Sequence, residues 1–154
     1  MSAPPSNIKS LKRENGCMDE KQRDLVQSWL TKALHDLESA DGLANLQRSR
    51  IDTAVYHCQQ SAEKAIKGFL IFQDETPPKI HLLGPLITAA AQYDHRFALF
   101  SDAADLLTPL ATEYRYPGSL HEPTRAEFDT AYQYAEEIYR YIISLLPTEA
   151  HPTQ

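Results

Sequence analysis

The chain has 154 residues, 42% of them hydrophobic, and a formal net charge of −6 at pH 7. This length suits one domain with its own core. The negative charge argues against a broad basic face for nucleic acid, but it is compatible with one or two arginines in a groove or with a basic partner. No apolar run approaches the roughly 20 residues that span a bilayer, and the first residues lack a secretory signal. We therefore expect a cytoplasmic protein that does not bind a membrane.

The N-terminal part predicts a tail followed by a helix. Residues 1–20 carry Ser, Pro, Asn and Gly without periodicity, which is typical of a flexible tail. A first helix is expected over residues 21–42, and residues 43–50 are expected to form a loop or a frayed end. The apolar stripe of this helix contains Leu30, Leu34 and Leu37.

The second helix has the strongest pattern in the chain, because apolar residues recur three and four positions apart. Gln60, Lys64 and Lys67 lie on another face of it, and Glu63 with Lys67 forms a favourable i,i+4 pair. The Pro77-Pro78 pair excludes a longer helix. The predicted core combines this stripe with residues of other helices: Val55, Cys58, Ala62, Ile66, Phe69, Leu34, Leu37, Phe100, Leu107, Ile138 and Ile142.

Two further helices are predicted in the middle of the chain. A short helix covers about residues 83–93, and another begins near His95. Thr108-Pro109 should kink or shorten the latter, because proline lacks the backbone N–H that a helix interior requires. No cysteine shows a metal-type spacing, so neither a metal site nor another cofactor is expected.

The last helix is predicted from its end signals. Thr124 and Glu127 have the spacing of a capping box, and Pro147 stops the helix. Residues 147–154 are expected to be a second flexible tail. Since no segment alternates in the manner of a strand, the sequence predicts an all-α fold, an antiparallel bundle of four to five helices over residues 21–146.

The segment YRYPGSLH, Tyr114 to His121, interrupts the helical pattern with a Pro-Gly turn. Arg115 offers a planar fork that matches phosphate, and His121 can transfer a proton near neutral pH. Together they could cleave RNA without a metal: the histidine would deprotonate the ribose 2′-hydroxyl or protonate the leaving oxygen, and the arginine would stabilise charge on the phosphate. A structural role stays open, since an arginine at a helix C-terminus also meets free carbonyls.

The remaining histidines are expected to have structural roles. His35, His57, His95 and His151 have no partner at ligand spacing, so each is interpreted as a surface or capping residue. His81 is expected to cap the third helix or to line a groove. The tyrosines of the last helix are expected at an interface more than in base stacking.

Four segments occur in the order of a known family. They are WLTKALHDLESA in the first helix, YHCQQSAEKAIKGFL in the second, KIHLL before the third and RYPG before the last. Through them the chain resembles the HEPN domain family over about Trp29 to Leu146. The resemblance implies an antiparallel helical bundle that usually dimerises.

The resemblance also implies a function. Many HEPN proteins are ribonucleases, often toxins paired with a minimal nucleotidyltransferase antitoxin, and their signature is an arginine and a histidine separated by four to six residues. Arg115 and His121 match that spacing, and the resemblance places such a site at the dimer interface. Pro123 stands where the best-known toxins carry the tyrosine that an antitoxin modifies, and the RYP branch was named for nucleotide binding.

The expected protein is therefore a homodimer that binds RNA or a nucleotide. Arg115 and His121 are the candidate catalytic residues of a metal-independent ribonuclease, the toxin-like member of a module with a nucleotidyltransferase. The candidates for nucleotide or RNA binding are Gln60, Lys64, Lys67 and Tyr116. The alternatives are a non-catalytic nucleotide-binding or protein-interaction module that serves this partner, and a helical bundle without a nucleic-acid role.

Overall fold

The computed structural model describes residues 18–118 and 121–153, and within these ranges the chain is all-helical, as predicted. The α-helices are α2 (Glu20–Ala44), α3 (Ile51–Phe72), α4 (Leu83–Ala91), α5 (Ser101–Leu107) and α6 (Arg125–Leu145). Short 3-10 segments join or follow them: η1 (His95–Phe100), η2 (Thr108–Ala111) and η3 (Thr148–Ala150). No helix in this part of the chain is both long enough and apolar enough to cross a membrane.

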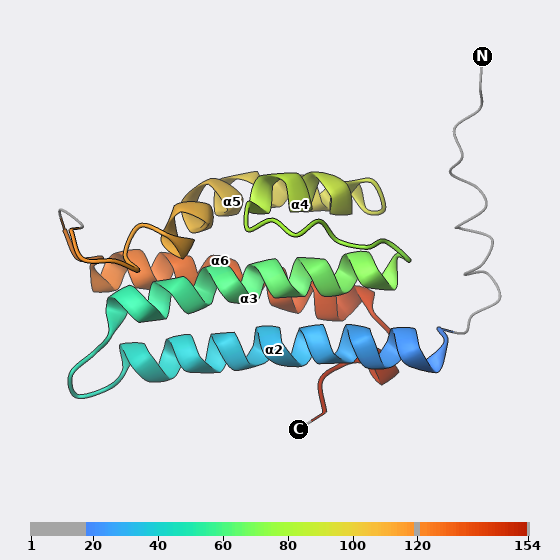
Figure 1. Ribbon diagram of the computed structural model, residues 1–154, viewed down its shortest axis with the longest axis horizontal. Coiled ribbons are helices and arrows are strands. Elements are labelled where there is room, and N and C mark those ends of the chain that lie inside the picture. The colour runs from blue at the N-terminus through green and yellow to red at the C-terminus, as the bar shows by residue number, and fades with distance from the viewer. Residues whose placement is uncertain (1–17, 119–120, 154) are drawn as a thin grey trace, which may run out of the picture.

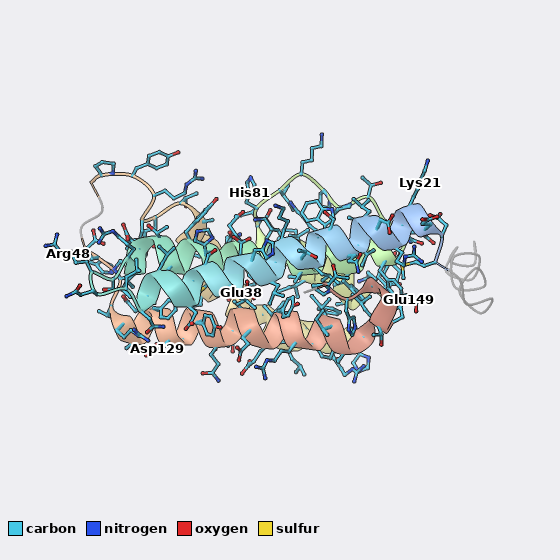
Figure 2. The ribbon with its side chains drawn as sticks, turned by 90° about the horizontal axis from the view of Figure 1, so that it is seen from below. Lys21, Glu38, Arg48, His81, Asp129 and Glu149 are labelled. Atoms are coloured by element: carbon cyan, nitrogen blue, oxygen red, sulfur yellow. The ribbon has the colours of Figure 1, made fainter. Side chains whose placement is uncertain are left out.

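Helix α3 is the centre of the bundle. It packs along α2 on one side and against α4 and α5 on the other, while α6 contacts both α2 and α3 (Figure 1). Charged side chains on the outer helices, such as Lys21, Glu38 and Asp129, are exposed (Figure 2). Because α3 is covered from several directions, most of its residues are buried, and this explains its wide apolar pattern.

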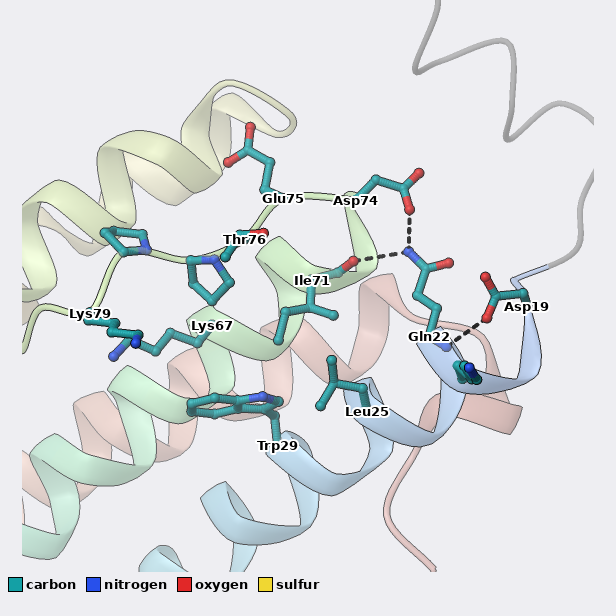
Figure 3. A pocket seen from close by; sticks show the side chains of 13 residues that line it. Asp19, Gln22, Leu25, Trp29, Lys67, Ile71, Asp74, Glu75, Thr76 and Lys79 are labelled. Carbon is teal, nitrogen blue, oxygen red and sulfur yellow. Dashed lines mark hydrogen bonds between the residues drawn. The ribbon is translucent and has the colours of Figure 1, made fainter.

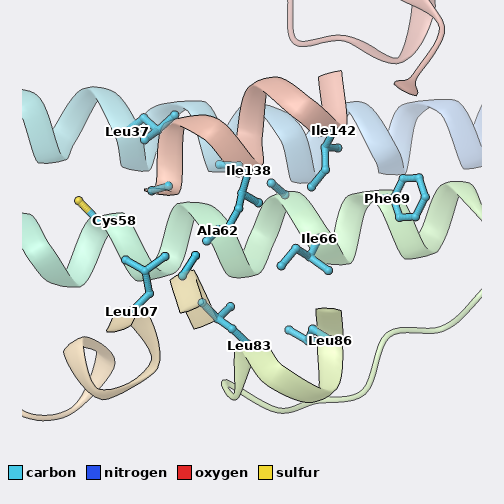
Figure 4. Close-up of a cluster of buried hydrophobic side chains, with 14 of the residues drawn as sticks. Leu37, Cys58, Ala62, Ile66, Phe69, Leu83, Leu86, Leu107, Ile138 and Ile142 are labelled. Atoms are coloured by element: carbon cyan, nitrogen blue, oxygen red, sulfur yellow. The ribbon is translucent and has the colours of Figure 1, made fainter. Parts of the chain in front are cut away.

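The predicted core is largely confirmed (Figure 4). The exceptions are Leu34 and Phe100, which are only half-buried. Several stripes on α2 have this spacing, and packing against α3 and α6 buries a neighbouring one, which leaves Leu34 at the edge of the interface. The buried residues of that stripe are Val26, Leu30, Ala33, Leu37, Ala40 and Ala44.

Capping side chains stabilise the N-terminal ends of α2 and α6. The carboxylate of Asp19 accepts a hydrogen bond from the backbone N–H of Gln22 at 2.9 Å and so caps α2. The predicted capping box is confirmed: the N–H of Glu127 donates to Thr124 Oγ1 at 3.1 Å, and the N–H of Thr124 donates to Glu127 Oε2 at 2.6 Å. Pro109 lies in η2, where the helical path changes as predicted.

The C-terminal segment differs from the predicted flexible tail. It folds back into η3, and Ala150 is fully buried in the core. His151 Nε2 donates to the carbonyl oxygens of Ile143 and Leu146, each at 3.0 Å, and Gln27 Nε2 donates to the carbonyl of His151 at 2.8 Å. These contacts satisfy free carbonyls at the end of α6 and hold the segment in place. Of the predicted N-terminal tail, residues 1–17 lie outside the described residues, and Glu20 already begins α2.

Candidate functional site

Arg115 is exposed and lies between η2 and α6, and aromatic rings hold its side chain. The guanidinium carbon is 5.0 Å from the ring centre of Tyr56 on α3 and 5.7 Å from that of Tyr116. Contact with ring faces restrains the planar group, while its N–H groups point outward from the edge and can bind an acceptor. Gly118 has a φ of 108°, in the left-handed region that favours glycine, so the Pro-Gly turn depends on this residue.

His121 lies on the α6 side of the same segment. Its Nε2 forms a hydrogen bond with the hydroxyl of Tyr114 at 3.2 Å and is 3.9 Å from Glu127 Oε1. Burial, together with the charges of Glu113, Glu127 and Glu122, raises the pKa of Tyr114, so its hydroxyl stays protonated at neutral pH. The hydroxyl therefore orients the His121 ring without adding a charge.

The described contacts of Arg115 and His121 connect them to different helices. Arg115 reaches α3 through Tyr56, whereas His121 approaches α6 at Glu127, the residue that completes its capping box. Beside Tyr114 and Glu127 a groove of about 400 Å³ opens between η2 and α6. Two exposed groups suited to phosphate chemistry thus lie between η2 and α6.

A buried carboxylate on α2 forms a cluster that the sequence did not predict. Asp36 Oδ1 is 2.7 Å from His57 Nδ1, and Asp36 Oδ2 accepts a hydrogen bond from Lys64 Nζ at 2.5 Å. Burial alone would raise the pKa of Asp36, but the hydrogen bonds from His57 and Lys64 outweigh it and hold the pKa below its ordinary value. Asp36 is therefore ionised at neutral pH and joins α2 to α3.

A second buried carboxylate, Glu63 on α3, forms a similar cluster. Its oxygens accept hydrogen bonds from Lys67 Nζ at 2.8 Å and Gln59 Nε2 at 3.1 Å, and both lie 3.1 Å from His81 Nδ1. Burial opposes ionisation here too, but the bonds from Lys67 and Gln59 outweigh it and lower the pKa of Glu63. Gln60 Nε2 joins this network by donating to Gln59 Oε1 at 2.7 Å.

The candidate binding residues from the sequence fall into two groups. Tyr116 is exposed and contacts Arg115. Gln60 and Lys64 are half-buried and Lys67 is only 6% exposed, and the clusters of Asp36 and Glu63 engage all three. The Glu63–Lys67 pair predicted on α3 is confirmed.

A family model for the HEPN domain matches residues 26–145. The chain belongs to the HEPN domain family. A crystal structure of TT1696 from Thermus thermophilus has a similar fold, with 24% sequence identity and a TM-score of 0.66 over 79% of this chain and 98% of that chain. A comparison with curated protein sequences finds no match.

The range matched by the HEPN model contains the exposed pair and the two buried carboxylate clusters described above. These residues are Arg115 and His121, and the carboxylates Asp36 and Glu63 with their partners.

At the C-terminal end of α3, a separate cavity of about 520 Å³ lies between α2 and the segment after α3 (Figure 3). Lys67 lines it, with its ammonium 5.9 Å from the ring centre of Trp29.

Proposed function

We propose that this HEPN protein binds RNA at the segment Tyr114–His121 and cleaves it as a ribonuclease. The observation that carries the proposal is the placement of Arg115, an exposed guanidinium held on two tyrosine rings, six positions before an exposed histidine. A restrained guanidinium can bind two phosphate oxygens at once. The ring of Tyr116, which is 68% exposed, offers a face on which a base can stack without sequence preference.

The proposed reaction transfers the phosphoryl group within the RNA. The ribose 2′-oxygen loses its proton and attacks the adjacent phosphorus, while the bond from phosphorus to the 5′-oxygen breaks and that oxygen gains a proton. The products are a 2′,3′-cyclic phosphate and a 5′-hydroxyl. Arg115 stabilises the negative charge of the transition state, and His121 transfers one of the two protons. Since proton transfer and charge stabilisation suffice, the reaction is expected to proceed with a chelator present.

Replacement of His121 by alanine tests the proposal. We expect the variant to lose at least about 100-fold in cleavage rate, the low end of what a positioned acid–base group contributes. Arg115→Lys should retain only part of the activity, because an ammonium lacks the two-point fork. The measurement is cleavage of a labelled RNA in EDTA by wild type and both variants, with mass spectrometry of the new ends.

The outcomes separate the alternatives. Equal cleavage by wild type and His121→Ala would assign the activity to another site or to a contaminant. RNA or nucleotide that is bound by wild type but left intact would instead support the non-catalytic binding module. Circular dichroism spectra of the variants serve as the control for folding.

We further propose that the active form is a two-fold homodimer that brings the two Tyr114–His121 segments together. The half-buried tyrosines of α6 (Tyr132, Tyr134 and Tyr139) have the amphipathic character of interface residues. Light scattering at micromolar concentration should give a mass near twice the 17.4 kDa of one chain. A monomeric mass would contradict a site shared by two subunits.

The physiological setting that we propose is a two-gene module, in which a minimal nucleotidyltransferase acts as the antitoxin. The net charge of −6 suits a partner with a basic surface. We expect a neighbouring gene to encode a minimal nucleotidyltransferase, and co-expression with its product should yield a stable complex and suppress the cleavage described above. Free chains and unchanged cleavage under co-expression would count against this pairing.

A further inference from the structure

His57 has the hydrogen-bonding arrangement of a general base. Its Nδ1 lies 2.7 Å from a carboxylate oxygen of Asp36, and the lowered pKa of Asp36 keeps that carboxylate ionised. An ionised carboxylate accepts but cannot donate, so the hydrogen of neutral His57 must lie on Nδ1. The lone pair is then on Nε2. The partner from α2 thus selects the tautomer that can accept a proton at Nε2.

The same histidine is linked to Arg115 through one aromatic ring. The rings of His57 and Tyr56 contact each other edge to face, with their centres 5.6 Å apart and their planes at 68°. The guanidinium of Arg115 lies 5.0 Å from the centre of the Tyr56 ring. Arg115 and His57 therefore contact the same aromatic ring.

Burial and charge also favour a chemical role for His57. Its side chain is 25% exposed, whereas the side chain of Asp36 is only 9% exposed. Lys64 also donates to Asp36, so the buried carboxylate has a permanent cation beside it as well as the histidine. Among the described contacts, His57 is linked to three charged groups: Asp36 from α2, Lys64 through Asp36, and Arg115 through the Tyr56 ring.

We propose that His57 is a second acid–base residue of the RNA site and that Asp36 is its positioning residue. The inference rests on the proposed ribonuclease function and adds a proton acceptor from within the same subunit. His57 Nε2 takes the proton of the 2′-hydroxyl as the oxygen bonds to phosphorus. Protonated His121 gives its proton to the 5′-oxygen as that oxygen leaves. The two histidines end with their protonation states exchanged, and solvent restores them.

The division of roles predicts how cleavage depends on pH. Wild type should show a bell-shaped profile of kcat/KM, because a neutral base and a protonated acid are required together. His57→Gln should lose about 100-fold at the optimum, and the limb that rises with pH should disappear. His121→Ala should lose the falling limb instead. Asp36→Asn should lower the rate, because its amide no longer fixes the His57 tautomer. His35→Gln, an exposed histidine of α2, is the matched control and should leave the profile unchanged.

A binding measurement on wild type does not depend on any variant folding correctly. Uridine 3′-phosphate is added during NMR of the histidine ring protons, and we expect the His57 and His121 signals to shift while that of His35 does not. An active wild type whose His57→Gln variant keeps both limbs would overturn the role of His57 and leave the ribonuclease proposal intact. An unshifted His57 signal alongside a shifted His121 signal would do the same. No cleavage by wild type would overturn the ribonuclease proposal itself, and the role of His57 with it.

Discussion

Replacing Phe69 by alanine is expected to lower the free energy of unfolding by about 3–5 kcal/mol. The side chain is 2% exposed in the middle of the core. Its ring centre lies 4.8 Å from that of Phe97 and 6.4 Å from that of Tyr93. Alanine would leave a cavity that these rings, held by their own neighbours, fill only in part. Urea denaturation followed by circular dichroism measures the change.

Two further substitutions test whether the loss of stability comes from the volume removed in the core. Phe69→Leu should cost clearly less than the alanine variant, because it removes less volume from the same place. Leu99 is 82% exposed, so Leu99→Ala should change stability by no more than about 0.5 kcal/mol. A loss below about 1 kcal/mol for Phe69→Ala would mean that the site collapses freely or is not packed as described.

The buried pair of Glu63 and Lys67 gives the second large effect. Glu63→Leu is expected to cost about 3–5 kcal/mol, because it leaves the ammonium of Lys67 buried without a counter-ion. The double variant Glu63→Leu/Lys67→Met should be markedly more stable than the single variant, since it removes both charges. Thermal unfolding of wild type, Glu63→Leu, Lys67→Met and the double variant measures the coupling free energy between the two residues. A double variant as unstable as Glu63→Leu would show that the loss comes from Gln59 and His81 instead.

The same cycle has a pH dependence of defined sign. The pKa of Glu63 is lowered in the folded state, so its ionised form stabilises the fold at pH values above the unfolded pKa of about 4.3. That contribution is lost as the pH falls through the lower pKa of the folded state. The double variant should therefore lose less stability than wild type between about pH 5 and pH 2. If the stability of wild type and of the double variant fell in parallel with pH, the lowered pKa of Glu63 would be contradicted. Asp36 cannot account for a difference, because both proteins contain it.

Much of the fold could be predicted because its determinants are local. The capping box of Thr124 and Glu127 contains its own partners within one turn, and Pro109 acts on the backbone beside it. Leu34 was placed wrongly in the core because several stripes on α2 satisfy the same spacing, and only the packed partner selects among them. The docked C-terminal segment was missed for a related reason: His151 caps a helix that ends before it, and no periodicity marks that contact.

The clusters around Asp36 and Glu63 depend on contacts between distant parts of the sequence. Asp36 and His57 are 21 positions apart, and Glu63 and His81 are 18 apart, so spacing alone relates neither pair. One feature of the sequence indicated a buried polar cluster. Gln59 and Glu63 interrupt the apolar pattern of the central helix α3 at positions that face the interior. Polar residues at such positions require buried partners, and the histidines were available to supply them.

The central position of α3 has a consequence for the synthesis of the protein on the ribosome. The hairpin of α2 and α3 emerges before α4 and α6, and α2 covers only one side of α3. The sides that meet α4 and α6 stay open until those helices have been made, and Ala150 joins the core only after α6 is complete. A product that terminates before α6 would thus expose apolar surface and attract chaperones and proteases, rather than persist as a stable half-domain.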